Sequence, residues 1–207
     1  MRVEPAVRTA VRLAAEELAE AILPTVLSRL REQTGRLQDL AGRITRDPDQ
    51  ALVDPSGVES LEADQELGRR IGWCLGVLAA ANGTDLLLAR RERDGLRDML
   101  ALVALARPEH PPEPAFDELP RLATSVGEGW EVPLLVAGLF LHAARTLPAG
   151  TPLRWEMERG TNAISFSVAG SPTRLPPELG ELVQLVPGAE LQLAEHTRLV
   201  IPSEWFA

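Results

Sequence analysis

The chain has 207 residues, and its 30 acidic and 21 basic side chains give a formal net charge of -9. This length is enough for one large domain or two small ones. The acidity argues against nucleic-acid binding, which needs a clustered basic face. No apolar run reaches the roughly 18 residues of a membrane span, and glutamate appears too early for a signal peptide. Cys74 has no possible internal disulfide partner, so we expect a cytoplasmic protein.

The first predicted element is a long helix from about Ala6 to Arg46. Pro24 lies in the middle of this segment, and because proline lacks a backbone N–H and clashes with the preceding turn, we expect a kink or a short break there. Apolar residues recur at steps of three, four or seven, which places one stripe along a helix, at Val7, Val11, Leu18, Ile22, Val26, Leu30, Leu37, Leu40 and Ile44.

A second helical stretch is predicted from about Val58 to Arg107, after a turn-rich segment from Asp47 to Gly57. The segment Asn82 to Asp85 resembles a C-cap followed by an N-cap, so the helix is either broken there or tolerates a glycine. Two antiparallel helices of this length bury only one face against each other. Pairing two such hairpins into a four-helix bundle covers the remaining apolar width, so we expect a homodimer, although the C-terminal part can supply some of this cover in cis.

A proline-rich segment from Arg107 to Pro114 predicts a linker between two parts of the chain. We therefore expect a helical hairpin dimerisation domain over residues 1–107 and a small domain over residues 115–207. Helices on one face of a mainly antiparallel sheet would make the second part an α+β sandwich. Its predicted elements are a short helix from Asp117 to Ser125, a helix from Val132 to Thr146, strands Leu153 to Glu158 and Ala163 to Val168, a helix from Pro177 to Val186, and strands Leu191 to Ala194 and Arg198 to Ile201.

This order of elements resembles the transmitter part of histidine kinases, in which a dimerising helical hairpin and a short linker precede an ATPase domain of helices over a mixed sheet. The segment Leu100 to Glu109 looks like the end of the second hairpin helix of that family. Phe116 to Leu119 looks like the start of the ATPase domain, and Leu134 to Gly150 is similar to the family's asparagine-box helix with its exit turn. The resemblance implies an α+β fold with an ATPase-like C-terminal domain.

The residues with which that family handles ATP are absent at the matching positions. Gly138 and His142 stand where the family has asparagines that hold a phosphate-bridging magnesium ion, and neither residue supplies the hard oxygen ligands that magnesium prefers. Gly170 stands at the position of the adenine-binding aspartate, and Pro172 and Arg174 replace glycines that approach the nucleotide. The resemblance therefore implies a degenerate domain that uses no cofactor or metal and is not an enzyme.

Histidine is the residue that a phosphotransfer protein would present on its helical hairpin, because imidazole can accept a phosphoryl group and pass it on. The three histidines, His110, His142 and His196, all lie outside the predicted hairpin and show no metal-ligand spacing. The sequence therefore offers no phosphoacceptor at the usual place.

From these observations we expect a non-catalytic signalling adaptor of the two-component type. It would dimerise and hold a response-regulator receiver domain or a sensor kinase, with Arg69, Arg70 and Trp73 on the docking surface of the second helix. Two alternatives stay open: a histidine phosphotransfer protein that uses His142, and a structural or assembly subunit whose hairpin joins unrelated helices.

Overall fold

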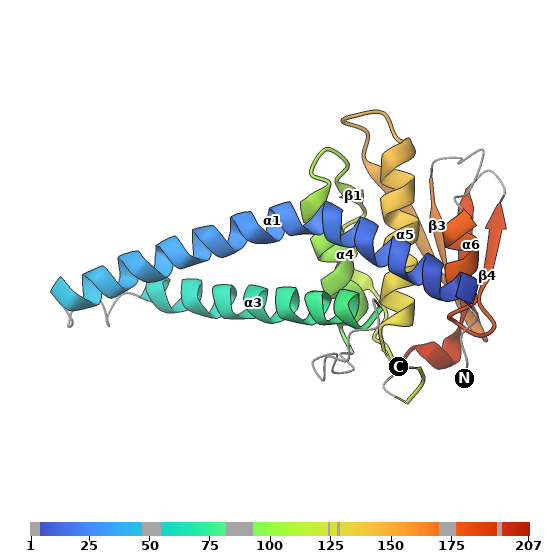
Figure 1. The fold of residues 1–207 in the computed structure, drawn as a ribbon, viewed down its shortest axis with the longest axis horizontal. Helices are drawn as coiled ribbons and strands as arrows, with labels where there is room; N and C mark the ends of the chain where they lie inside the picture. Colours follow the sequence, from blue (N-terminus) through green and yellow to red (C-terminus); the bar gives the residue numbers. More distant parts are fainter. Residues whose placement is uncertain are drawn as a thin grey trace.

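The computed structural model describes residues 5–46, 55–81, 93–123, 125–127, 129–169, 177–193 and 196–207. These residues form an α+β fold in which a layer of helices covers one face of a five-stranded mixed sheet, and a two-helix arm projects from this layer (Figure 1). Within the described ranges, no helix is both long enough and apolar enough to cross a bilayer.

The arm consists of α1 (Pro5–Arg46) and α3 (Pro55–Ala81), which lie antiparallel as the hairpin prediction expected (Figure 1). Helix α1 continues through Pro24, so of the expected kink or short break the break is not present. The axis of α1 does bend where the arm meets the helical layer (Figure 1). Only a C-terminal part of α1 belongs to the arm. Its N-terminal half crosses the helical layer and contacts the helices that cover the sheet. The first residues of the predicted loop, 47–54, lie outside the described part of the chain.

Helix α4 (Gly95–Ala106) is separate from α3, so the stretch from Val58 to Arg107 is not one helix. Asn82 to Asp85, where the sequence left open a break or a tolerated glycine, lie outside the described residues. Helix α4 turns away from the arm and packs against α5 (Glu131–Thr146) and α1 (Figure 1). It is part of the helical layer.

The described strands form a sheet in the order β1-β2-β3-β5-β4, with β1 parallel to β2 and every other neighbouring pair antiparallel. The two expected strand hairpins, β2–β3 and β4–β5, are confirmed. The strands are β1 (Pro112–Glu113), β2 (Leu153–Arg159), β3 (Ala163–Val168), β4 (Glu190–Leu193) and β5 (Thr197–Pro202).

The proline-rich segment expected as a linker supplies the edge strand β1. Pro112 pairs with Leu153, and Glu113 pairs with Arg154. A proline is tolerated at a sheet edge because its missing N–H can face away from the ladder. The segment is therefore part of the sheet.

Of the remaining predicted helices, α5 is confirmed, and α6 (Pro177–Val183) ends before the expected Val186 because the chain turns there. The expected helix from Asp117 to Ser125 is wrong. The chain makes one 3-10 turn, η1 (Phe116–Glu118), and then becomes extended. Proline at position 120 pushes the preceding residue, Leu119, out of the helical region, and Leu119 has φ -68° and ψ 145°.

One hydrophobic core connects the base of the arm with the helices and the sheet. It includes Ile22 and Val26 of α1, Ile71 and Val77 of α3, and the inward-facing residues of the sheet, among them Phe166 of β3. The boundary expected between residues 107 and 115 therefore passes through a continuous core.

Candidate functional site

An extended apolar surface lies on α1 in the arm. Its five large side chains keep between 37% and 49% of their surface exposed. Together with two smaller residues, Thr34 and Ala41, they are spaced alternately by four and three residues. This spacing is the repeat of a helix that packs along other helices. We call this surface the arm stripe, and it consists of Leu23, Leu27, Leu30, Thr34, Leu37, Ala41 and Ile44.

Helix α3 covers the face of α1 next to the arm stripe. Val26 is buried, and Gln33 and Leu40 are half-buried, each one residue before a stripe position. Gln33 lies against Gly68 of α3. Helix α1 thus has three core-type positions in each seven-residue repeat, which is the pattern of a bundle helix with more than one neighbour. Helix α3 occupies one side of this pattern and leaves the other open.

The two helices of the arm carry charges of opposite sign. Between residues 23 and 46, α1 has five arginines and two carboxylates, Glu32 and Asp39. The α3 segment has four carboxylates and two arginines. The basic half of α1 is unusual in a chain whose net charge is -9.

Arg69 and Arg70 form an ionic network that ties α3 to α4. Arg69 Nη2 donates to Asp98 Oδ2 at 3.0 Å, and Arg70 Nε lies 3.3 Å from Asp98 Oδ1. Both arginines also donate to the carboxylate of Glu66. These hydrogen bonds lower the pKa of Glu66 to about 2. The side chain of Asp98 has no exposed surface, and its burial raises its pKa in spite of the two guanidinium groups.

Trp73 lies at the base of the arm and is only 5% exposed. Its indole packs against the first residue of α4, Gly95, and the neighbouring Cys74 is buried as well. The three residues expected on a docking surface are therefore close together, but they differ in how far their side chains are exposed to solvent. The side chain of Arg69 is 39% exposed, whereas Trp73 offers no surface to a partner in this conformation.

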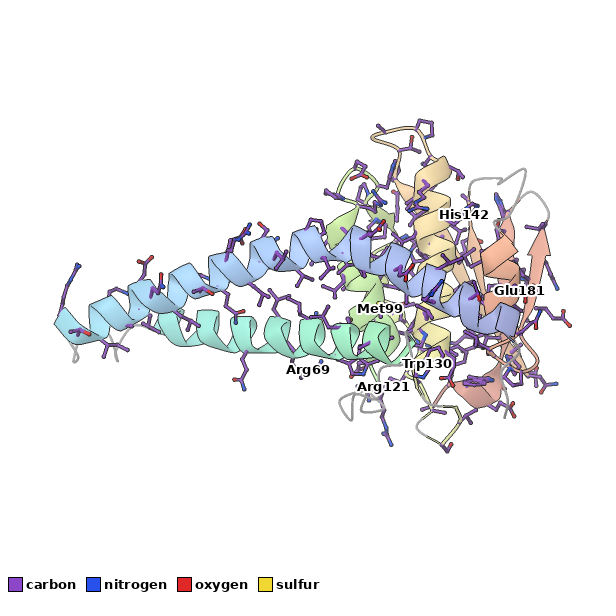
Figure 2. All side chains as sticks on the ribbon, viewed as in Figure 1. Arg69, Met99, Arg121, Trp130, His142 and Glu181 are labelled. Carbon is purple, nitrogen blue, oxygen red and sulfur yellow. The ribbon has the colours of Figure 1, made fainter. Side chains whose placement is uncertain are left out.

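The three histidines lie in separate parts of the fold. His142 is half-buried on α5, far from Arg69 on α3 (Figure 2). His110 is buried, and its Nδ1 lies 2.9 Å from the carbonyl oxygen of Thr151. His196 is exposed before β5. Among the described side chains, no group of three or more His, Cys, Asp or Glu residues is placed to hold a metal ion.

Asp98 is the residue of this site that the sequence reasoning missed. The signal was available, because Asp98 is a single carboxylate in the apolar run of α4, next to Met99 and Leu100. A buried charge of this kind needs a partner of opposite sign. The sequence alone does not identify Arg69 and Arg70 as that partner, because the arginines at positions 90, 91, 93 and 97 lie nearer in the chain.

The sequence was compared with protein-family models and with curated proteins. The chain matches no protein-family model, and a search of curated proteins returned no match to it.

Proposed function

We propose that the protein is a homodimeric adaptor of the two-component type. In this proposal the arms of two copies pack into a four-helix bundle, and the dimer holds a receiver domain or a sensor kinase without transferring phosphate. The observation that carries the proposal is the arm stripe, a regular apolar surface on a projecting arm that none of the described elements covers (Figure 1).

A second copy of this chain is the occupant that the charges of the arm favour. When two arms pack side by side, the basic half of α1 can lie between its own α3 and the α3 of the other copy, and both of these segments are acidic. Such complementarity favours the correct partner and register over others. An unrelated helix would have to reproduce this distribution of charge.

The helical face of the sheet supports a binding role over a kinase role. Gly138, which the resemblance aligns with a magnesium-holding asparagine, has Leu179 and Leu182 of α6 packed about its α-carbon. A Cβ built at position 138 would lie 3.5 Å from a methyl group of each leucine. Helix α1 also contacts α5 and α6. These apolar side chains occupy the side of α5 where the family would bring its phosphates.

Dimerisation is tested by analytical ultracentrifugation of the double variant Leu30→Gln/Leu37→Gln. Burial of a leucine side chain contributes roughly 1.5–3 kcal/mol, and two copies bring four leucines to the interface. We therefore expect dimer dissociation to become easier by more than about a hundredfold. The variant should stay helical, because both positions are already exposed in one copy.

Ser28→Gln is the matched control, because Ser28 is exposed on the arm and lies outside the stripe. It should dimerise like the wild type. A wild-type protein that stays monomeric at all accessible concentrations, or a double variant that still dimerises, would show that the arm stripe does not hold two copies together.

The adaptor role is tested with phosphorylated receiver domains. We expect a stable complex, no phosphate on the adaptor after incubation, and no saturable binding of ATP with magnesium. An acid-labile phosphate on His142 would instead establish the phosphotransfer alternative. Stable co-purification with a complex outside signalling would favour the structural subunit.

A further inference from the structure

The open face of the sheet, opposite the helices, has a groove of about 550 Å³ beside the edge strand β1. Two of its residues, Glu156 of β2 and Ser167 of β3, are direct neighbours across the two strands. Arg154 and Glu113 lie at the edge side of the groove, and His196 lies at the other side. We call this feature the sheet groove.

The charges of the described residues that line the sheet groove do not balance. Arg154 Nε lies 3.5 Å from Glu113 Oε2, so the one arginine among the described lining residues already faces a carboxylate. Glu156 is exposed, and no hydrogen bond or ion pair joins it to another described residue. Within the described part of the chain, the groove therefore presents one uncompensated carboxylate, that of Glu156.

The remaining lining of the groove suits a side chain with an apolar stem. Pro114 and Ala169 contribute apolar surface. The Trp155 indole N–H donates to the carbonyl oxygen of Pro114 at 2.6 Å, and this hydrogen bond holds the backbone of Pro114 in place at the side of the groove. Arginine and lysine side chains lay their methylene stems on apolar surface and keep the charged end at a polar partner. A guanidinium group has enough donors to reach both the Glu156 carboxylate and the Ser167 hydroxyl.

We propose that the sheet groove binds a cationic side chain, arginine before lysine, from a polypeptide partner. The inference does not depend on the proposed dimer, because the groove lies on the sheet and the arm projects from the helical layer (Figure 1). The protein would thus have two separate contact surfaces, an apolar one on the arm and a cation-binding one on the sheet.

The test is a titration followed by the indole N–H signals in ¹H–¹⁵N NMR spectra. The chain has four tryptophans, and only Trp155 lines the groove, so Trp73, Trp130 and Trp205 are internal controls in the same spectrum. The probe is the capped tripeptide Gly-Arg-Gly, and the comparison peptides carry citrulline or glutamate in place of arginine. We expect a saturable shift of the Trp155 signal with arginine, weaker binding with neutral citrulline, and none with glutamate.

Glu156→Gln should weaken binding of the arginine peptide by about three- to fivefold, which is the size of one partly exposed charge pair. Glu190→Gln is the control, because it removes the same charge from an exposed position on β4, outside the groove. It should leave the affinity unchanged.

The proposal would be overturned by a Trp155 shift of equal size with the citrulline peptide, by equal losses of affinity in both variants, or by the absence of a Trp155 shift with the arginine peptide. Agmatine is the cationic side chain without its peptide. If agmatine bound as tightly as the tripeptide, the ligand would be a free amine and the polypeptide source would be wrong.

Discussion

At Gly95, the arm and the helical layer approach each other closely. A Cβ at this position would lie 2.5 Å from two ring atoms of Trp73. The indole is rigid and buried, so Gly95→Ala must push α3 and α4 apart. We expect the free energy of unfolding to fall by about 1–3 kcal/mol, as in other overpacked cores. Chemical denaturation measures this difference.

Gly72→Ala is the matched control for this contact. Gly72 lies on α3 next to Trp73, but nothing lies within 4 Å of its Cβ position. Alanine should therefore stabilise the helix by up to about 1 kcal/mol. Equal losses in the two variants would contradict the close fit of Gly95 against the indole.

The burial of Trp73 shows how far a sequence can predict the environment of a single residue. The sequence placed Trp73 correctly on a helix, together with two arginines that share one ionic network. Its burial depends on Gly95, which is distant in the chain and belongs to another helix. No spacing on α3 indicates that contact, so the expected docking surface included a core residue.

At the scale of elements, α1 passes through Pro24 although proline removes a backbone donor. Buried residues lie on both sides of it, at Ala15, Ile22 and Val26, so core contacts hold the helix together where local chemistry favours a break. Pro24→Ala should therefore raise the free energy of unfolding by about 1–3 kcal/mol. Thermal denaturation measures the change, and Thr25→Ala, which should have little effect, is the control. A loss of stability in Pro24→Ala would contradict the prediction.

The elements that the sequence predicted well are those defined by local pattern. Alternation of apolar residues indicated β2 and β3, and a dense apolar run indicated α5. The elements that it missed depend on distant partners. The strand β1 exists because Pro112 pairs with Leu153, which follows much later in the chain. The same limit applies to the sheet groove, whose lining comes from several strands.

At the scale of the whole molecule, the helical layer joins the two parts that the sequence separated. Helix α5 is buried on nearly every side, because α1 and α4 pack on it as well as α6 and β3. A helix that is apolar all round needs neighbours all round. A fragment of residues 115–207 lacks α1 and α4.

We therefore expect this fragment to have no cooperative thermal transition, whereas the full chain has one. Circular dichroism and calorimetry compare the two proteins directly. A fragment with a sharp transition and native-like helix content would show that the C-terminal part is an independent domain, as the sequence indicated.

Helix α1 carries both the arm stripe and the cover over α5 and α6, and no break separates the two regions. Their relative phase is thus set by the number of residues between them. One residue inserted after Val26 would rotate everything beyond it by about 100°. The stripe from Leu27 onward would then turn away from its present direction, while the N-terminal part of α1 kept its contacts with α5 and α6. The number of residues in α1 therefore determines the direction in which the arm stripe faces relative to the rest of the fold.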